Sequence, residues 1–255
     1  MWTNYHYIFL CLACIAAVRV RVYNIERYGI YLDENAPYHH LRSAKVLSET
    51  GSLNNWYDTQ SWHPIGVEKG GSVSSFPGLL HVASITHRIS NIFSQLISNQ
   101  TISMYHICVF LPIIGSVLST VLSYLVVKEI STTKNTSPQV AKVRGLVAAG
   151  FVAIVPGYVY RSVAGLYDYE SVGIPAMLLC CYLWISACST TTSGNRTSTI
   201  YKCVQFAVSY GALMSVWSTG SLFVGFTILV HVGFIFFVLT EKKDLSNLYE
   251  VVTFR

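Results

Sequence analysis

Four long stretches of this 255-residue chain contain no Asp, Glu, Lys or Arg, and this pattern constrains the fold more than any other feature. The stretches are residues 102–127, 145–160, 171–188 and 203–240. A helix needs about 20 apolar residues to cross the roughly 30 Å hydrocarbon core of a bilayer. Each of the first three stretches therefore predicts one membrane span. The fourth is long enough for two, with a turn near residues 218–221.

Residues 2–18 are also apolar and predict a further span at the N-terminus. A cleavable signal peptide is the alternative, but such a peptide begins with basic residues, and none precede this apolar stretch. The sequence thus predicts an all-α polytopic membrane protein with about six transmembrane helices. We expect a first helix in residues 1–22, a long luminal loop in 23–101, and five further helices with short loops and a cytosolic tail in 102–255.

Charged residues are scarce and unevenly placed. They make up 11% of the chain, against about 25% in an ordinary soluble domain, which excludes disordered tails, nucleic-acid-binding modules and small disulfide scaffolds. In the short loops and tail, nine basic residues fall on one side of the predicted membrane: Lys128, Lys134, Lys142, Arg144, Arg196, Lys202, Lys242, Lys243 and Arg255. The short connections on the other side hold only Arg161. Basic residues in short loops mark the cytosolic side of a membrane protein. The net charge of +5 therefore reflects the orientation of the chain in the membrane and does not indicate a nucleic-acid-binding patch.

This orientation places the N-terminus in the cytosol. Arg19, Arg21 and Arg27 argue against it, but they enter a long loop, where the charge rule is weak. Of the Asn-x-Ser/Thr sequons at Asn99, Asn135 and Asn195, only the first then lies on the luminal side.

Two acidic clusters occur where charge is unexpected. Asp33 and Glu34 follow the first predicted span, and Asp168 and Glu170 lie between the third and fourth. The number of intervening spans puts both clusters on the same, non-cytosolic face, where they could form one site. Carboxylate oxygens suit Mg²⁺ and Mn²⁺, and Arg161 could pair with a phosphate or a carboxylate. The simpler interpretation is a solvated acidic pair bound to Arg161.

The long polar loop combines aromatic residues with Pro and Gly turns in segments 55–66 and 69–78, which favours a folded loop at the membrane interface. His39 and His40 in this loop could be metal ligands. Since no third ligand stands at a useful spacing, we expect a solvent-facing pair without such a role.

Several motifs resemble one family. The run at residues 155–170, Val-Pro-Gly-Tyr-Val-Tyr-Arg-Ser-Val-Ala-Gly-Leu-Tyr-Asp-Tyr-Glu, is similar to the signature of the catalytic subunit of oligosaccharyltransferase, where a near-identical run ends in Ser-Tyr-Asp-Asn-Glu. Residues 62–66 (Trp-His-Pro-Ile-Gly) and 76–79 (Phe-Pro-Gly-Leu) resemble the family's Trp-Tyr-Pro-Leu-Gly and Tyr-Pro-Gly-Leu. The resemblance covers nearly the whole chain, in order.

The resemblance implies a C-type glycosyltransferase of the endoplasmic reticulum membrane. Such enzymes transfer a preassembled glycan from dolichyl diphosphate to the Asn of an acceptor polypeptide's sequon, often with further oligosaccharyltransferase subunits. By position, Asp168 and Glu170 match the family's second acidic motif, which binds Mn²⁺ or Mg²⁺. Arg161 matches an arginine near the lipid diphosphate, and Glu34 matches the glutamate of the first motif, which makes it a further catalytic candidate.

Two departures qualify this resemblance. The first motif reads Asp33-Glu-Asn-Ala-Pro-Tyr38, so that Ala36 stands at the position of the family's catalytic, metal-binding aspartate. We expect Asp33, as a metal ligand, or Glu34 to take over its role. In addition, the family's chains are longer and carry a Trp-Trp-Asp-Tyr-Gly motif that is not in this sequence, so we expect an N-terminal portion of the enzyme. The alternatives are a non-catalytic paralogue that binds lipid-linked glycan or complex partners, and a transporter, which would leave the aromatic loop unexplained.

Overall fold

The structure is a computed structural model that describes residues 5–52, 57–59, 63–68, 77–132, 136–192 and 196–241. The described residues are mostly helical. The helices are α1 (Tyr5–Tyr28), α2 (Asn35–Thr50), α3 (Pro77–Ser98), α4 (Met104–Ser131), α5 (Pro138–Ile154), α6 (Pro156–Tyr160), α7 (Tyr169–Thr192), α8 (Arg196–Val216) and α9 (Ser218–Glu241). Two short strands, β1 (Tyr57–Asp58) and β2 (Val67–Glu68), pair antiparallel between α2 and α3.

Four helices in the described ranges are long and apolar enough to cross a membrane: α1, α4, α7 over Tyr169–Thr190, and α9 over Ser218–Phe236. The all-α polytopic membrane fold predicted from the charge-free stretches is therefore confirmed. Helices α5 and α8 lie at the other two predicted spans, but α5 has 17 residues, fewer than the roughly 20 that a perpendicular span needs. The total of six spans stays a prediction.

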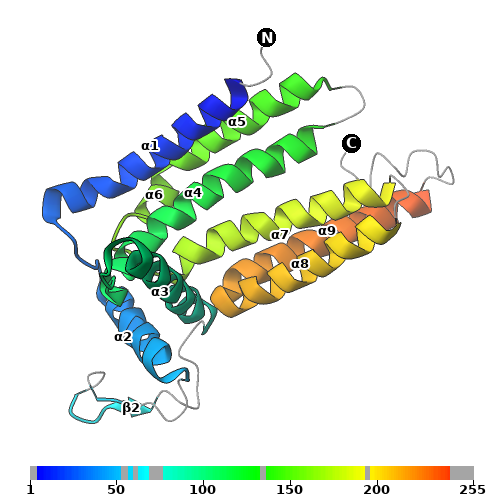
Figure 1. The fold of residues 1–255 in the computed structure, drawn as a ribbon. Helices are drawn as coiled ribbons and strands as arrows, with labels where there is room; N and C mark the ends of the chain where they lie inside the picture. Colours follow the sequence, from blue (N-terminus) through cyan, green and yellow to red (C-terminus); the bar gives the residue numbers. More distant parts are fainter. Residues whose placement is uncertain are drawn as a thin grey trace.

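The helices form two groups with a smaller unit across one end. Figure 1 shows α1, α4 and α5 side by side, α7, α8 and α9 as a second group, and α2 and α3 at one end of both. The groups join where α4 packs on α7. A Cβ at Gly115 of α4 would lie 2.1 Å from the carbonyl oxygen of Ser171, so glycine lets the two backbones meet.

The segment between the first two spans is folded. Helix α1 continues beyond the predicted end of the first span at residue 22, to Tyr28. Gly51 follows the last residue of α2 and caps the helix: it has a left-handed conformation (φ +75°), and its N–H donates to the carbonyl oxygen of Leu47. Arg42 of α2 binds Asp58 of β1 through an Nη2–Oδ2 contact of 3.1 Å, which fixes the ribbon to the helix. The aromatic residues Trp62 and Phe76 lie outside the described residues.

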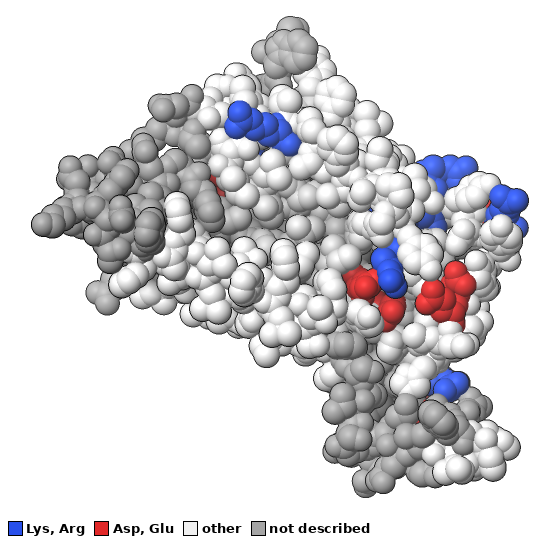
Figure 2. Space-filling model, turned by 180° about the vertical axis from the view of Figure 1, so that it is seen from behind, with Lys and Arg blue, Asp and Glu red and all other residues white. Residues whose placement is uncertain are grey.

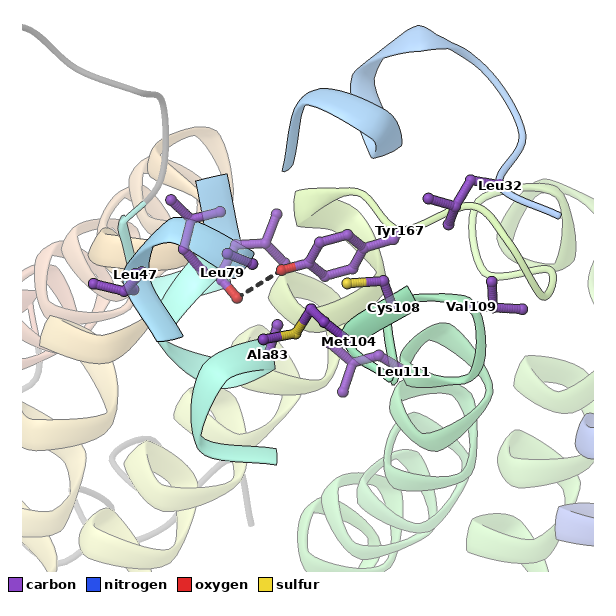
Figure 3. Packing of buried hydrophobic residues seen from close by; sticks show 11 residues of the cluster. Leu32, Leu47, Leu79, Ala83, Met104, Cys108, Val109, Leu111 and Tyr167 are labelled. Atoms are coloured by element: carbon purple, nitrogen blue, oxygen red, sulfur yellow. Dashed lines mark hydrogen bonds between the residues drawn. The ribbon is translucent and has the colours of Figure 1, made fainter. Parts of the chain in front are cut away.

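A hydrophobic core lies where α2, α3 and α4 meet the linker between α6 and α7. Tyr167 of the linker is fully buried at its centre, against Leu79, Met104 and Cys108 (Figure 3). The Tyr167 hydroxyl donates to the carbonyl oxygen of Leu79 at 2.9 Å. Burial raises the pKa of Tyr167 well above its usual value, so the hydroxyl stays a donor. The core thereby anchors the residue that directly precedes Asp168.

Candidate functional site

The predicted acidic residue Asp168 lies in the linker 161–168, and backbone hydrogen bonds hold this linker against the first group of helices. The amide of Ala164 donates to the carbonyl oxygen of Arg21 in α1 at 3.2 Å. The amide of Gly165 donates to the carbonyl oxygen of Val109 in α4 at 3.0 Å. Because both acceptors belong to long helices, the linker has a defined position despite having no regular structure of its own.

Gly165 also joins the two acidic segments of the sequence. Its carbonyl oxygen accepts a hydrogen bond of 3.1 Å from the amide of Asp33. Gly165 has a φ of +93°, and a Cβ there would lie only 2.3 Å from the carbonyl oxygen of Tyr31. Only glycine meets both requirements without strain. This contact brings the segment after α1 against the segment before α7.

The buried side chain of Arg21 is hydrogen-bonded to the linker. The side chain of Arg21 is fully buried; its Nε donates to Ser162 Oγ at 2.8 Å, and its Nη1 donates to the carbonyl oxygens of Ala17 at 3.0 Å and Ala153 at 2.8 Å. The guanidinium also lies 4.9 Å from the ring centroid of Tyr158. Sequence reasoning treated Arg21 only as a topology signal, although an arginine between apolar residues of a span is itself a sign of a specific partner.

Asp168 and Glu170 stand at the start of α7. Asp168 precedes the helix and is 9% exposed; its Oδ1 accepts from the amide of Tyr169 at 2.7 Å, and its carbonyl oxygen accepts from the amide of Ser171 at 3.1 Å. Glu170 lies in the first turn. Carboxylates are favoured at a helix N-terminus, where the helix dipole is positive and backbone amides are free to donate.

The structure brings four of the predicted site residues together. Arg161 Nε lies 3.0 Å from Glu170 Oε2. The hydroxyl of Tyr160 donates to Glu34 Oε1 at 3.4 Å across 126 residues of sequence, and both Glu34 and Asp168 are close enough to Glu170 to act on it electrostatically. Figure 2 shows acidic side chains gathered on one part of this face, with a basic side chain between them.

The remaining predicted residue, Asp33, has a more local role. Its Oδ1 accepts from the amide of Glu34 at 3.1 Å. Glu34 has φ 64° and ψ 173°, a conformation that costs non-glycine residues about 1–3 kcal/mol and is frequent at functional sites. Ala36 is exposed in the first turn of α2. The exposed carboxylate of Glu34 thus lies two residues before the position where the family has its aspartate.

The expectation of a solvent-facing histidine pair was wrong for His40. His40 is 6% exposed, its ring lies edge-on to Tyr167 at 6.1 Å, and its Nε2 lies 3.4 Å from Asp168 Oδ1. Adjacent positions on a helix point in directions about 100° apart, so one of two neighbouring histidines can face the core. The sequence carried no signal that the partner of His40 would be Asp168.

The donor atoms at this site suit a hard divalent cation. Glu170 Oε2 is buried and has no hydrogen bond despite its ion pair with Arg161, so it has lone pairs to offer. Among the described residues, no group of three or more His, Cys, Asp and Glu side chains is placed to hold a metal ion. Mg²⁺ and similar ions are, however, commonly bound by one or two carboxylates, with water and substrate phosphate completing the shell. The residues present fit that mode.

Comparisons with known proteins identify the family and the fold of this chain. The family described as oligosaccharyl transferase STT3, N-terminal, matches residues 5–255. The dolichyl-diphosphooligosaccharide–protein glycosyltransferase subunit STT3 of Dictyostelium discoideum is 31% identical over 237 residues, which are 92% of this chain and 29% of the relative. The chain therefore spans less than a third of that relative's length.

Two solved structures of the Archaeoglobus fulgidus oligosaccharyltransferase share the fold. One is tethered to an acceptor peptide containing an NVT sequon; it superposes with a TM-score of 0.73 at 22% identity, over 99% of this chain and 29% of that one. The other is a complex with Zn and sulfate, with a TM-score of 0.63 at 21% identity, over 90% of this chain and 27% of that one.

Proposed function

Because the chain belongs to the oligosaccharyl transferase STT3 family, we propose that it forms the metal and lipid-diphosphate part of an oligosaccharyltransferase active site. The reaction is transfer of a preassembled oligosaccharide from dolichyl diphosphate to the Asn of an Asn-x-Ser/Thr sequon. The acceptor's amide nitrogen bonds to the anomeric carbon as the bond from that carbon to the diphosphate breaks, and the amide nitrogen loses one of its two protons. The site belongs on the luminal face of the endoplasmic reticulum membrane.

One observation carries this proposal: the meeting of Glu34, Asp168, Glu170 and Arg161 at one end of the membrane helices. Ionisable residues at the end of a membrane span are costly and usually functional. A site for diphosphate departure needs a cation or cation ligands near the leaving group, and this cluster offers both. The retained cluster favours transfer over the non-catalytic paralogue.

Asp168 and Glu170 would hold Mn²⁺ or Mg²⁺, which would act as a Lewis acid and neutralise charge on the departing diphosphate. Arg161 is suited to bind a phosphate, since its side chain is 46% exposed and guanidinium groups bind phosphate oxygens in pairs. Its ion pair with Glu170 positions the guanidinium until the phosphate arrives.

Glu34 is the residue that we assign to the acceptor amide. Its carboxylate is exposed and can accept a hydrogen bond from the amide N–H, which would draw electron density onto the attacking nitrogen. Asp33, with its carboxylate bonded to the amide of Glu34, is the alternative residue and a further metal ligand. Glu34 is exposed and Asp33 is half-buried.

The test is transfer to a sequon peptide by membranes that carry the complete protein with its accompanying subunits. We expect Asp168→Asn to lower the rate about 100-fold or more, since that factor corresponds to about 2.7 kcal/mol of lost transition-state stabilisation. Glu49→Gln is the matched control, because Glu49 is an exposed acid on α2 whose ion-pair partner is Lys45. Equal transfer by wild type and Asp168→Asn would refute the proposed function.

A further inference from the structure

His40 is a buried potential metal ligand at the acidic site, where the sequence predicted a solvent-facing side chain. It extends from α2, and its Nε2 lies 3.4 Å from Asp168 Oδ1. The two side chains are 8% and 13% exposed. Buried polar side chains normally form hydrogen bonds of ordinary length. A nearly buried imidazole beside a nearly buried carboxylate at a longer distance therefore calls for an explanation.

The distance between the two atoms is informative. It is longer than the 2.7–3.2 Å of an ordinary N–H···O hydrogen bond. Two atoms bound to one cation at about 2.1 Å, with a tetrahedral angle between the bonds, lie about 3.4 Å apart, and octahedral neighbours lie about 3.0 Å apart. The observed 3.4 Å between Nε2 and Oδ1 is compatible with two ligands that share a cation.

Both side chains are held in place by other contacts. The His40 ring packs edge-on against Tyr167, and Tyr167 is fixed by its hydrogen bond to Leu79. Asp168 Oδ1 accepts from the amide of Tyr169, which orients the carboxylate and leaves further lone pairs. Ligands held in this way lose little conformational entropy when a cation binds.

The charges around the pair favour a cation. Glu170 and Glu34 are close enough for electrostatic interaction with each other, and Asp168 is next to Glu170. Arg161 partly compensates these charges through its ion pair with Glu170. Three carboxylates against one guanidinium leave a negative field in which a divalent ion is stabilised.

We propose that His40 Nε2 and Asp168 Oδ1 bind the same divalent cation, and that the nitrogen ligand makes this site select Mn²⁺, Co²⁺ or Zn²⁺ over Mg²⁺. Imidazole suits transition metals and contributes little to Mg²⁺, which prefers oxygen ligands. The inference deepens the proposed function and rests on its assignment of Asp168 to the metal. Water and substrate phosphate would supply the other ligands.

The test is Mn²⁺ binding to the purified full chain in lipid nanodiscs, followed by electron paramagnetic resonance. For wild type we expect ¹⁴N coupling from one imidazole and an affinity for Mn²⁺ at least about tenfold above that for Mg²⁺. His40→Leu should lose the ¹⁴N coupling and bind Mn²⁺ about 10–100-fold more weakly, with little change for Mg²⁺. His39→Leu, the matched neighbour, should retain the wild-type signal.

His40→Gln keeps a polar side chain of similar reach. It serves as a second variant in case His40→Leu does not fold. It should unfold at the wild-type temperature but lack the imidazole coupling. Mn²⁺ bound to wild type without ¹⁴N coupling would overturn the proposal, as would unchanged coupling in His40→Gln.

The outcome for Asp168→Asn separates the two proposals. If this variant loses both Mn²⁺ binding and transfer while His40→Leu retains normal Mn²⁺ coordination, only the role of His40 fails. If Asp168→Asn retains both Mn²⁺ binding and transfer, the proposed function fails, and with it the shared site.

Discussion

Gly165→Ala offers the sharpest test of how the two acidic segments are held together. The methyl group would lie 2.3 Å from the carbonyl oxygen of Tyr31, in a backbone with φ +93°. A left-handed conformation costs an L-residue about 1–2 kcal/mol, and forcing an extra carbon into a packed site costs about 1–3 kcal/mol. The sum is about 2–5 kcal/mol. This is a large part of the free energy of unfolding of a typical domain, which is about 5–15 kcal/mol.

The strain can be relieved by moving the Tyr31–Glu34 segment away from the linker. That movement would break the hydrogen bond from Asp33 to Gly165 and separate Glu34 from Glu170. We therefore expect a lower unfolding temperature in nanodiscs and weaker Mn²⁺ binding, measured on the same preparation.

Gly150→Ala is the matched control. Gly150 lies inside α5, and a Cβ there would meet nothing within 4 Å, so alanine should stabilise the helix by about 0.5–1 kcal/mol. If Gly165→Ala unfolds at the wild-type temperature and binds Mn²⁺ normally, the account of this contact is refuted.

Three further predictions address other parts of the molecule. Gly115→Ala should push α4 away from α7 and lower stability by about 1–3 kcal/mol, seen as a lower unfolding temperature; an unchanged value would contradict the close packing of these helices. Arg21→Lys should lower the free energy of unfolding by about 1.5–3 kcal/mol in denaturant titrations. The reason is that lysine cannot reproduce the hydrogen bond to Ser162 together with those to two carbonyl oxygens. A variant as stable as wild type would show that the positive charge alone suffices. Asn99 is exposed between α3 and α4, so Asn99→Gln should remove one N-glycan and increase gel mobility, whereas Asn135→Gln should not; the reverse result would invert the predicted orientation.

Local chemistry explains why the helices could be predicted. The charge-free stretches coincide with α4, α7 and α9, because a backbone inside a bilayer must satisfy its own hydrogen bonds in a helix. Ser103 and Ser137 accept from the amides of His106 and Val140 and cap the starts of α4 and α5, as serine commonly does. Each of these effects depends on residues within one or two helical turns.

The acidic site could be predicted only in part. Asp168 and Glu170 stood out because carboxylates are rare next to apolar spans, and the likeness of residues 155–170 to a known family strengthened that inference. The position of His40 could not be found in this way. Its neighbours Tyr167 and Asp168 lie more than 120 residues away in sequence, and no local pattern records such a contact.

The sequence by itself determined that this chain is a helical membrane protein and predicted which carboxylates form its candidate site, because both inferences follow from the cost of placing charge in or near hydrocarbon. Only the tertiary structure decided the partners of those charges: Glu170 with Arg161, Asp168 with His40, and the linker with Arg21. The reason is physical. Pairing energies depend on distances of a few ångströms, and packing between distant helices sets those distances.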